Sequence, residues 1–115
     1  AGKYVLANPI ALTVSENSNI IILDEDKLLF FDQFGNGLKK LKLSFEPTNI
    51  NHFNERITLV NENHVFLMKA NSNSSPQKVT LIPKPEGIIK DALIFGCKLY
   101  LLTNNKIIVF EPTNK

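Results

Sequence analysis

Three segments of the chain share one pattern of hydrophobic and polar positions. Each has a polar residue, four apolar residues, four polar residues, four more apolar residues and a closing polar residue, and Thr58 alone interrupts the apolar runs. The segments are Asn19–Asp32, Arg56–Lys69 and Lys98–Glu111, so their first residues lie 37 and 42 positions apart. Short apolar runs around polar turns predict β-hairpins, and the runs lack the three-to-four spacing of a helix.

A second, shorter motif recurs with nearly the same period. Lys3–Pro9, Lys40–Pro47 and Lys78–Pro85 each contain a basic residue, a short extended run and a closing proline, and their starts lie 37 and 38 residues apart. Two motifs with one period indicate an internal repeat. We therefore divide the chain, as a single domain, into three repeats at about 1–37, 38–75 and 76–115.

The hairpin strands are apolar at consecutive positions rather than at alternate ones, which is typical of a sheet buried on both faces. Antiparallel hairpins buried in this way need a further sheet stacked on either side. A four-stranded sheet of about 40 residues that stacks face to face with its neighbours is a β-propeller blade. The predicted fold class is therefore all-β, with three four-stranded antiparallel β-propeller blades that form half or part of a propeller. A β-sandwich or barrel is the alternative, but it explains neither the double burial nor the repeat.

The pattern also predicts the order of the strands. The first blade has its inner strand at Ile10–Val14, its hairpin at Ile20–Asp32 and its outer strand at Leu38–Phe45. The second blade runs from about Ile50 to Ile82, and the third runs from about Ile88 to Glu111 without an outer strand.

The N-terminal strand Lys3–Ala7 is the one strand left unassigned, and its sequence matches the outer strands of the first two blades. We expect it to complete the third blade, in the way that one terminus closes a ring-shaped propeller. Closed propellers use about four to eight blades. Three blades therefore predict a protein partner, which is either another copy that closes the ring or the remainder of a longer propeller.

The segment Leu28–Gly35, with the sequence LLFFDQFG, resembles the third strand and following turn of NHL-type six-bladed propellers, which read apolar, Phe, Asp, two residues, Gly. All three repeats share the pattern, but the motif is clear only in the first. Met68-Lys69 replaces Phe-Asp in the second repeat, and Pro112 follows Glu111 in the third. The resemblance implies a binding platform more often than an enzyme, and it favours an exported protein, periplasmic or extracellular.

Composition narrows the class of function. The chain has 115 residues and a formal net charge of +2, and Arg56 is its only arginine, so no nucleic-acid partner is predicted. No apolar run approaches the roughly 18 residues of a membrane-spanning helix, so no transmembrane segment is predicted. The single Cys97 allows neither an intrachain disulfide nor a cysteine-based metal site.

Few residues suggest chemistry. His52, Lys90 and Asp91 belong to the candidate inner strands and could face a central channel, so they are the candidate ligand-binding residues. Asp24–Asp26 forms an acidic cluster of the kind that holds Ca²⁺, but it coincides with a hairpin turn, so a polar turn is the preferred interpretation. Cys97 has no His or Asp pattern beside it that would activate the thiol. We predict no catalytic residue, no metal site and no cofactor.

The leading hypothesis is a non-catalytic binding or scaffold module of the β-propeller type that mediates protein–protein contacts. Loops at the ends of the inner strands, at Asn49–Asn54 and Glu86–Asp91, are the expected contact surface. One alternative is a ligand-binding, carbohydrate-binding or enzymatic propeller with its site in the central channel. Another is a structural subunit of a larger assembly.

Overall fold

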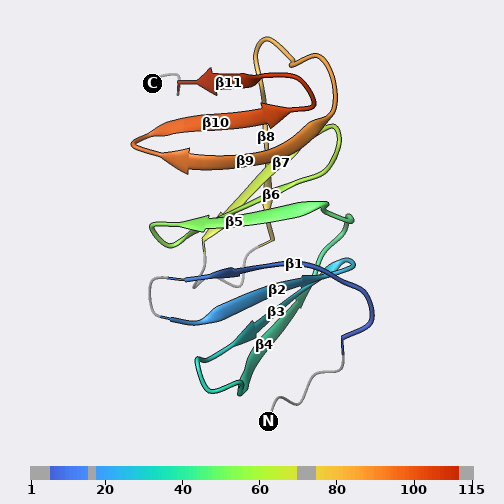
Figure 1. Ribbon diagram of the computed structural model, residues 1–115, viewed down its shortest axis with the longest axis vertical. Helices are drawn as coiled ribbons and strands as arrows, with labels where there is room; N and C mark the ends of the chain where they lie inside the picture. Colours follow the sequence, from blue (N-terminus) through green and yellow to red (C-terminus); the bar gives the residue numbers. More distant parts are fainter. Residues whose placement is uncertain (1–5, 16–17, 70–74, 112–115) are drawn as a thin grey trace.

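The computed structural model describes residues 6–15, 18–69 and 75–111, and all regular structure in these ranges is β-strand (Figure 1). The first sheet contains, in spatial order, β1 (Pro9–Val14), β2 (Ile20–Asp24), β3 (Lys27–Phe31) and β4 (Gly37–Lys42). The second contains β5 (Asn49–Phe53), β6 (Arg56–Val60), β7 (Val65–Lys69) and β8 (Gln77–Val79). The third contains β9 (Ile89–Phe95), β10 (Lys98–Thr103) and β11 (Ile107–Phe110). No helix that could cross a membrane occurs in the described ranges.

The strands follow the assignment made from the sequence. In the first sheet, the expected inner strand, hairpin and outer strand correspond to β1, to β2 and β3, and to β4. All neighbouring strands pair antiparallel, and the third sheet has no fourth strand among the described residues. The predicted all-β arrangement of three antiparallel sheets is confirmed.

Two of the hairpin turns place consecutive residues at positive φ. Between β5 and β6, Asn54 and Glu55 have φ angles of 54° and 65°. Between β9 and β10, Gly96 and Cys97 have φ angles of 59° and 66°. Two successive positive φ angles are the mark of a type I′ turn, whose twist matches that of the flanking strands.

A hydrophobic core lies between each pair of neighbouring sheets. The first core lies between the first and second sheets and contains Ile21, Leu23, Leu28, Phe30, Leu43, Ile50, Ile57, Leu59 and Met68. The second core lies between the second and third sheets and contains Val60, Val65, Ile89, Ala92, Leu99 and Leu101. The middle sheet contributes to both cores, which confirms the burial on two faces that its consecutive apolar residues predicted.

The sheets fan out from their first strands. In the middle of Figure 1, β5 lies between β1 and β9, and the first and third sheets extend from there towards opposite ends of the 45 Å long axis. Within the described part of the chain, one face of the first sheet and one face of the third therefore have no sheet packed on them. We call these the outward faces.

The expected N-terminal strand Lys3–Ala7 lies mostly outside the described residues. At its described end, the backbone amides of Ala7 and Asn8 donate hydrogen bonds of 2.9 and 2.6 Å to the carboxylate of Asp24 in β2. This end of the segment is therefore attached to the first sheet, whereas β11 lies at the other end of the molecule.

Candidate interaction surface

Equivalent positions of the three hairpin motifs allow the faces of the sheets to be compared. In the first sheet one set of positions holds Ile21, Leu23, Leu28 and Phe30, all in the first core. In the second sheet the same set holds Thr58, Val60, Val65 and Leu67, of which Val60 and Val65 belong to the second core. In the third sheet it holds Tyr100, Leu102, Ile107 and Val109. In the first two sheets these positions face the next sheet. The third sheet has no further sheet beside it within the described residues.

The side chains at these positions of the third sheet point outward. Leu101 belongs to the second core, so its neighbour along the strand, Leu102, points to the opposite face. Leu102 is 43% exposed and Ile107 is 69% exposed. At the equivalent positions of the first sheet, Leu23 and Leu28 are both 0% exposed. Position in the repeat, and not hydrophobicity alone, therefore makes this face the equivalent of a face that is buried in the first sheet.

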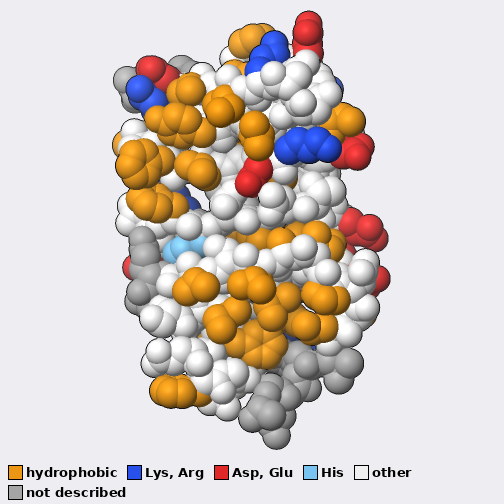
Figure 2. All heavy atoms as spheres, in the orientation of Figure 1, with side chains coloured by type: hydrophobic (Ala, Val, Ile, Leu, Met, Phe, Trp, Pro, Cys, Tyr) orange, Lys and Arg blue, Asp and Glu red, His pale blue; other side chains and the backbone are white. Residues whose placement is uncertain are grey.

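The outward face of the third sheet is an apolar surface with a shallow hollow of about 400 Å³. Leu93 and Phe95 of β9 extend it beyond the hairpin, and both are exposed. The ring of Phe95 lies 5.2 Å from that of Phe53 at the end of β5. Figure 2 shows hydrophobic side chains gathered over the strands of the third sheet and, separately, over those of the first. A contiguous apolar surface of this kind is typical of an interaction site.

The outward face of the first sheet is its counterpart. Four apolar side chains are exposed there or at its margin: Ile10, Leu12, Val14 and Leu38. Ile22 lies opposite Leu12 in the ladder and Leu29 lies opposite Ile22, so these residues share one face. Ile22 and Leu29 are the repeat equivalents of Leu59 and Phe66, which pack the second sheet onto the first. This face of the first sheet therefore carries the positions through which the second sheet contacts its neighbour, although Leu29 itself is only 1% exposed.

The edge of the third sheet is a further candidate for binding. In the first sheet β3 pairs with β4, and in the second sheet β7 pairs with β8. Within the described residues β11 pairs only with β10. An unpaired strand edge offers backbone N–H and C=O groups to an added strand.

The three candidate residues of the central channel do not form one cluster. Asp91 accepts hydrogen bonds of 2.5 Å from Nδ2 of Asn51 and 2.8 Å from the amide of Ala92. Burial raises the pKa of the Asp91 carboxyl above its usual value, and these two hydrogen bonds oppose the rise. Within the described residues, neither His52 nor Lys90 forms a hydrogen bond or ion pair with Asp91.

His52 contributes a different feature. Its Nε2 atom is buried, and no partner for it occurs among the described residues. Lys90 is exposed on β9. The residue that does join Asp91 is Asn51, which the sequence analysis did not single out. A polar side chain next to the buried Ile50 in an inner strand was the signal that could have identified it.

The acidic cluster is engaged by the protein itself. Asp24 is fully buried, and its carboxylate holds the two amides of Ala7 and Asn8. Asp26 pairs with Lys42 at 2.7 Å and with Lys27 at 3.5 Å, and the hydrogen bond from Lys42 lowers the pKa of Asp26. Among the described residues no group of three His, Cys, Asp or Glu side chains is arranged to bind a metal ion.

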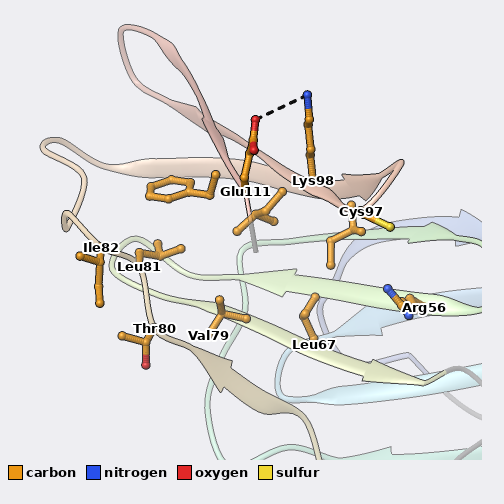
Figure 3. A pocket seen from close by; sticks show the side chains of 12 residues that line it. Arg56, Leu67, Val79, Thr80, Leu81, Ile82, Cys97, Lys98 and Glu111 are labelled. Atoms are coloured by element: carbon orange, nitrogen blue, oxygen red, sulfur yellow. Dashed lines mark ion pairs between the residues drawn. The ribbon is translucent and has the colours of Figure 1, made fainter. Parts of the chain in front are cut away.

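A cleft of about 410 Å³ opens at the outer edge between the second and third sheets (Figure 3). Leu67 and Val79 of the second sheet and Leu81, which follows that sheet, line it. The ion pair between Lys98 and Glu111, at 3.7 Å, lies on the side of the third sheet. The exposed thiol of Cys97 also lines this cleft.

Repeat equivalence explains why this junction is open. Between the first and second sheets, Phe45 stacks on Phe66 with ring centroids 3.8 Å apart. At the next junction the equivalent positions hold Pro83 and Ile108, which are smaller.

The two segments expected to form contact loops turn out to be largely strand. Residues 49–53 form β5, and residues 89–91 belong to β9. Their side chains contribute to the contact between the sheets, as Asn51 and Asp91 illustrate. The apolar outward faces, rather than these segments, are the larger candidate surfaces.

No protein-family model and no curated protein sequence matches the chain. Two solved structures of Hsv2 from Kluyveromyces lactis are similar to it, one with a complete loop 6CD and one with that loop replaced by a Gly-Ser linker. Their TM-scores are 0.67 and 0.65 at 11% identity, and the matches cover 93% and 90% of this chain. PorZ, a bacterial surface component of the type-IX secretion system of Porphyromonas gingivalis, matches with a TM-score of 0.59 at 13% identity over 96% of this chain.

The likeness at these identities concerns the fold alone. The chain spans about a third of the Hsv2 chains, 33% and 35%, and 17% of the PorZ chain. Because the neighbours are propeller proteins and the sheets are stacked and antiparallel, the three sheets are blades that make up part of a β-propeller.

Proposed function

We propose that the chain is a non-catalytic binding or scaffold module of the β-propeller type that mediates protein–protein contacts through the outward face of its third blade. One observation carries the proposal: Leu102 and Ile107 are exposed, although Leu23 and Leu28 at the same repeat positions are completely buried between blades. Burying apolar side chains of this size contributes about 1.5–3 kcal/mol each, so a partner that covers them gains substantial binding energy.

Two finer assignments accompany this proposal. The NHL-type relationship is supported by Asp32, whose carboxylate accepts hydrogen bonds from the amides of Phe34 and Asn36, so the Phe-Asp-x-x-Gly segment forms a defined turn. An exported location is supported by the likeness to PorZ, which is described as a bacterial surface component. We retain a single domain of three repeats as the organisation of the chain.

Site-specific photocrosslinking in the cells that produce the protein tests the proposed surface. A photoreactive phenylalanine analogue at Ile107 is expected to form protein adducts, because a partner covers this position. The same analogue at Glu46, which is exposed on the segment after β4, is the matched control. Adducts at Ile107 no more abundant than those at Glu46 would contradict the proposal.

A site in the central channel is the second candidate function. The buried and unpartnered Nε2 of His52 and the raised pKa of Asp91 are the observations that favour it. A panel of monosaccharides and oligosaccharides, screened by thermal shift, tests it against a triple variant with alanine at His52, Lys90 and Asp91. A sugar that raises the Tm of the unmodified chain but not of the triple variant supports the channel site, and equal shifts in both exclude it.

A further inference from the structure

We propose that the partner of the third blade is a second copy of this chain, whose segment Lys3–Leu6 adds to β11 as the missing fourth strand. The outward face of that copy's first blade then covers the outward face of the third. This inference rests on the proposed function, because it names the occupant of the same surface. Two copies related in this way complete a ring of six blades, within the usual range of about four to eight.

The edge of β11 and the segment Lys3–Leu6 match by their places in the repeat. The fourth strands β4 and β8 each follow the third strand of their own blade and carry the motif of a lysine followed by an apolar residue. Lys3-Tyr4 opens the remaining copy of this motif. β11 is a third strand, and within the described residues it has no fourth strand beside it. Within the described residues, the third blade therefore lacks the kind of strand that the segment encodes.

The register of the added strand follows from the two complete blades. In the first blade, Leu41 lies opposite Leu28 in the antiparallel ladder. In the second blade, Val79 lies opposite Val65.

Leu28 and Val65 are the repeat equivalents of Ile107, and Leu41 and Val79 are the equivalents of Tyr4. The proposal therefore places Tyr4 of the second copy opposite Ile107. By the same equivalence, Lys3 lies opposite Ile108.

The segment of the same copy cannot make this contact. The amides of Ala7 and Asn8 are fixed by Asp24 in the first blade. Stacked sheets lie about 10 Å apart, so the third blade is roughly 20 Å from the first, whereas one residue of chain spans at most about 3.6 Å. Leu6, which precedes Ala7 directly, therefore stays near the first blade of its own copy. The segment Lys3–Leu6 can therefore reach β11 only from another copy of the chain.

The two outward faces are reciprocal surfaces. In the junction between the first and second blades, Leu23 and Leu28 of one blade pack with Leu59 of the other in a single core. The outward face of the third blade carries Leu102 and Ile107 at the positions of Leu23 and Leu28. The outward face of the first blade carries Ile22 at the position of Leu59. Packing one face on the other repeats a contact that already occurs within the chain.

Disulfide trapping between two differently marked copies tests the proposed strand and its register. Both copies carry Cys97→Ser; one also carries Tyr4→Cys and the other Ile107→Cys. Residues directly opposite in an antiparallel ladder have Cα atoms about 4.5–5.5 Å apart, within the reach of a disulfide. The matched control replaces Ile107→Cys by Glu111→Cys, which the proposed register places four residues away.

Under mild oxidation, we expect the Tyr4→Cys and Ile107→Cys pair to give about tenfold more mixed disulfide than the control pair. Equal yields, or no mixed disulfide from either pair, would overturn the proposal of a second copy. Far-UV circular dichroism of each variant verifies that the sheets are intact. Photocrosslinking at Ile107 in cells separates the proposed surface from the proposed identity of its partner. If adducts form at Ile107 in cells but the purified copies give no mixed disulfide, the surface binds a partner other than a second copy.

Discussion

Asp24, Asn61 and Thr103 occupy the same position in the three repeats. At this position a side-chain oxygen accepts hydrogen bonds from backbone amides. Asn61 accepts from the amides of Asn63 and His64 at 2.9 and 2.8 Å, so it closes its own turn. Thr103 accepts from the amide of Lys106 at 3.2 Å in the same way. Asp24 differs, because its carboxylate reaches the segment that enters β1. The same position thus stabilises a turn in two blades and anchors the N-terminal segment in the first.

Asp24→Ala is expected to destabilise the fold strongly. Asp24 is fully buried and accepts two backbone hydrogen bonds, and hydrogen bonds to charged groups contribute about 1.5–3 kcal/mol each. We expect a loss of about 3 kcal/mol in the free energy of unfolding, measured by urea denaturation. Asp26→Ala is the control, because its ion pairs lie at the surface and their loss has a much smaller effect. Similar losses for the two variants would show that Asp24 does not anchor the segment.

We expect the stability of the protein to depend on pH through Asp91 and Asp32. As pH rises, the contribution of Asp91 to stability falls and that of Asp32 increases. Burial raises the pKa of the Asp91 carboxyl in the folded protein above its value in the unfolded chain, which is near 3.9. The contribution of Asp91 to the free energy of unfolding is therefore full below about pH 3.9 and is lost as pH rises through the raised pKa. Asp91→Asn should therefore gain stability relative to the unmodified chain between pH 4 and neutral pH.

Asp32 provides the matched comparison. Hydrogen bonds from Asn36 and Phe34 lower the pKa of Asp32 in the folded protein. The contribution of Asp32 to the free energy of unfolding is therefore present above its pKa in the unfolded chain and is lost as pH falls through the lowered pKa. Asp32→Asn should therefore lose stability relative to the unmodified chain as pH rises to about 4 and beyond. Urea midpoints at a series of pH values measure both variants, and slopes of the same sign would contradict the assignment.

At the scale of elements, the hairpins were predictable because their pattern is local. Short apolar runs around polar turns specify β2 and β3 as clearly as they specify β10 and β11. The bond between Asn51 and Asp91 was not predictable, because it joins inner strands of different blades through side chains 40 positions apart in the sequence. The cleft depends on the absence of an aromatic pair at one junction, which becomes visible only when the junctions are compared in space.

The aromatic stack between the first and second sheets is expected to contribute more to the free energy of unfolding than an exposed aromatic side chain does. Phe66→Ala removes the ring that stacks on Phe45, and it should lower the free energy of unfolding by about 3 kcal/mol. Phe34→Ala is the control, since Phe34 is 76% exposed and its loss should change stability by less than about 0.5 kcal/mol. Chemical denaturation of both variants measures the difference. Equal effects would mean that the stack does not hold the junction together.

At the scale of the whole molecule, the fold was predictable from periodicity, whereas the proposed binding surface could be identified only from the stacking order of the blades. The sequence pattern makes every hairpin apolar on both faces, so it predicts stacking without saying which faces remain uncovered. The structure identifies them as one face of the first blade and one face of the third. The contact loops expected at Asn49–Asn54 and Glu86–Asp91 follow from position along the chain, which does not show how the blades stack.

The mass of the purified chain in solution tests whether two copies pair through their outward faces. We expect a mass of twice 12.9 kDa by light scattering. We also expect Ile107→Lys to weaken the association by roughly 30-fold or more, because an interfacial apolar anchor is replaced by a charge. Glu46→Lys is the control and should leave the dimer intact. A mass of 12.9 kDa for the folded, unmodified chain at every concentration would show that two copies do not pair.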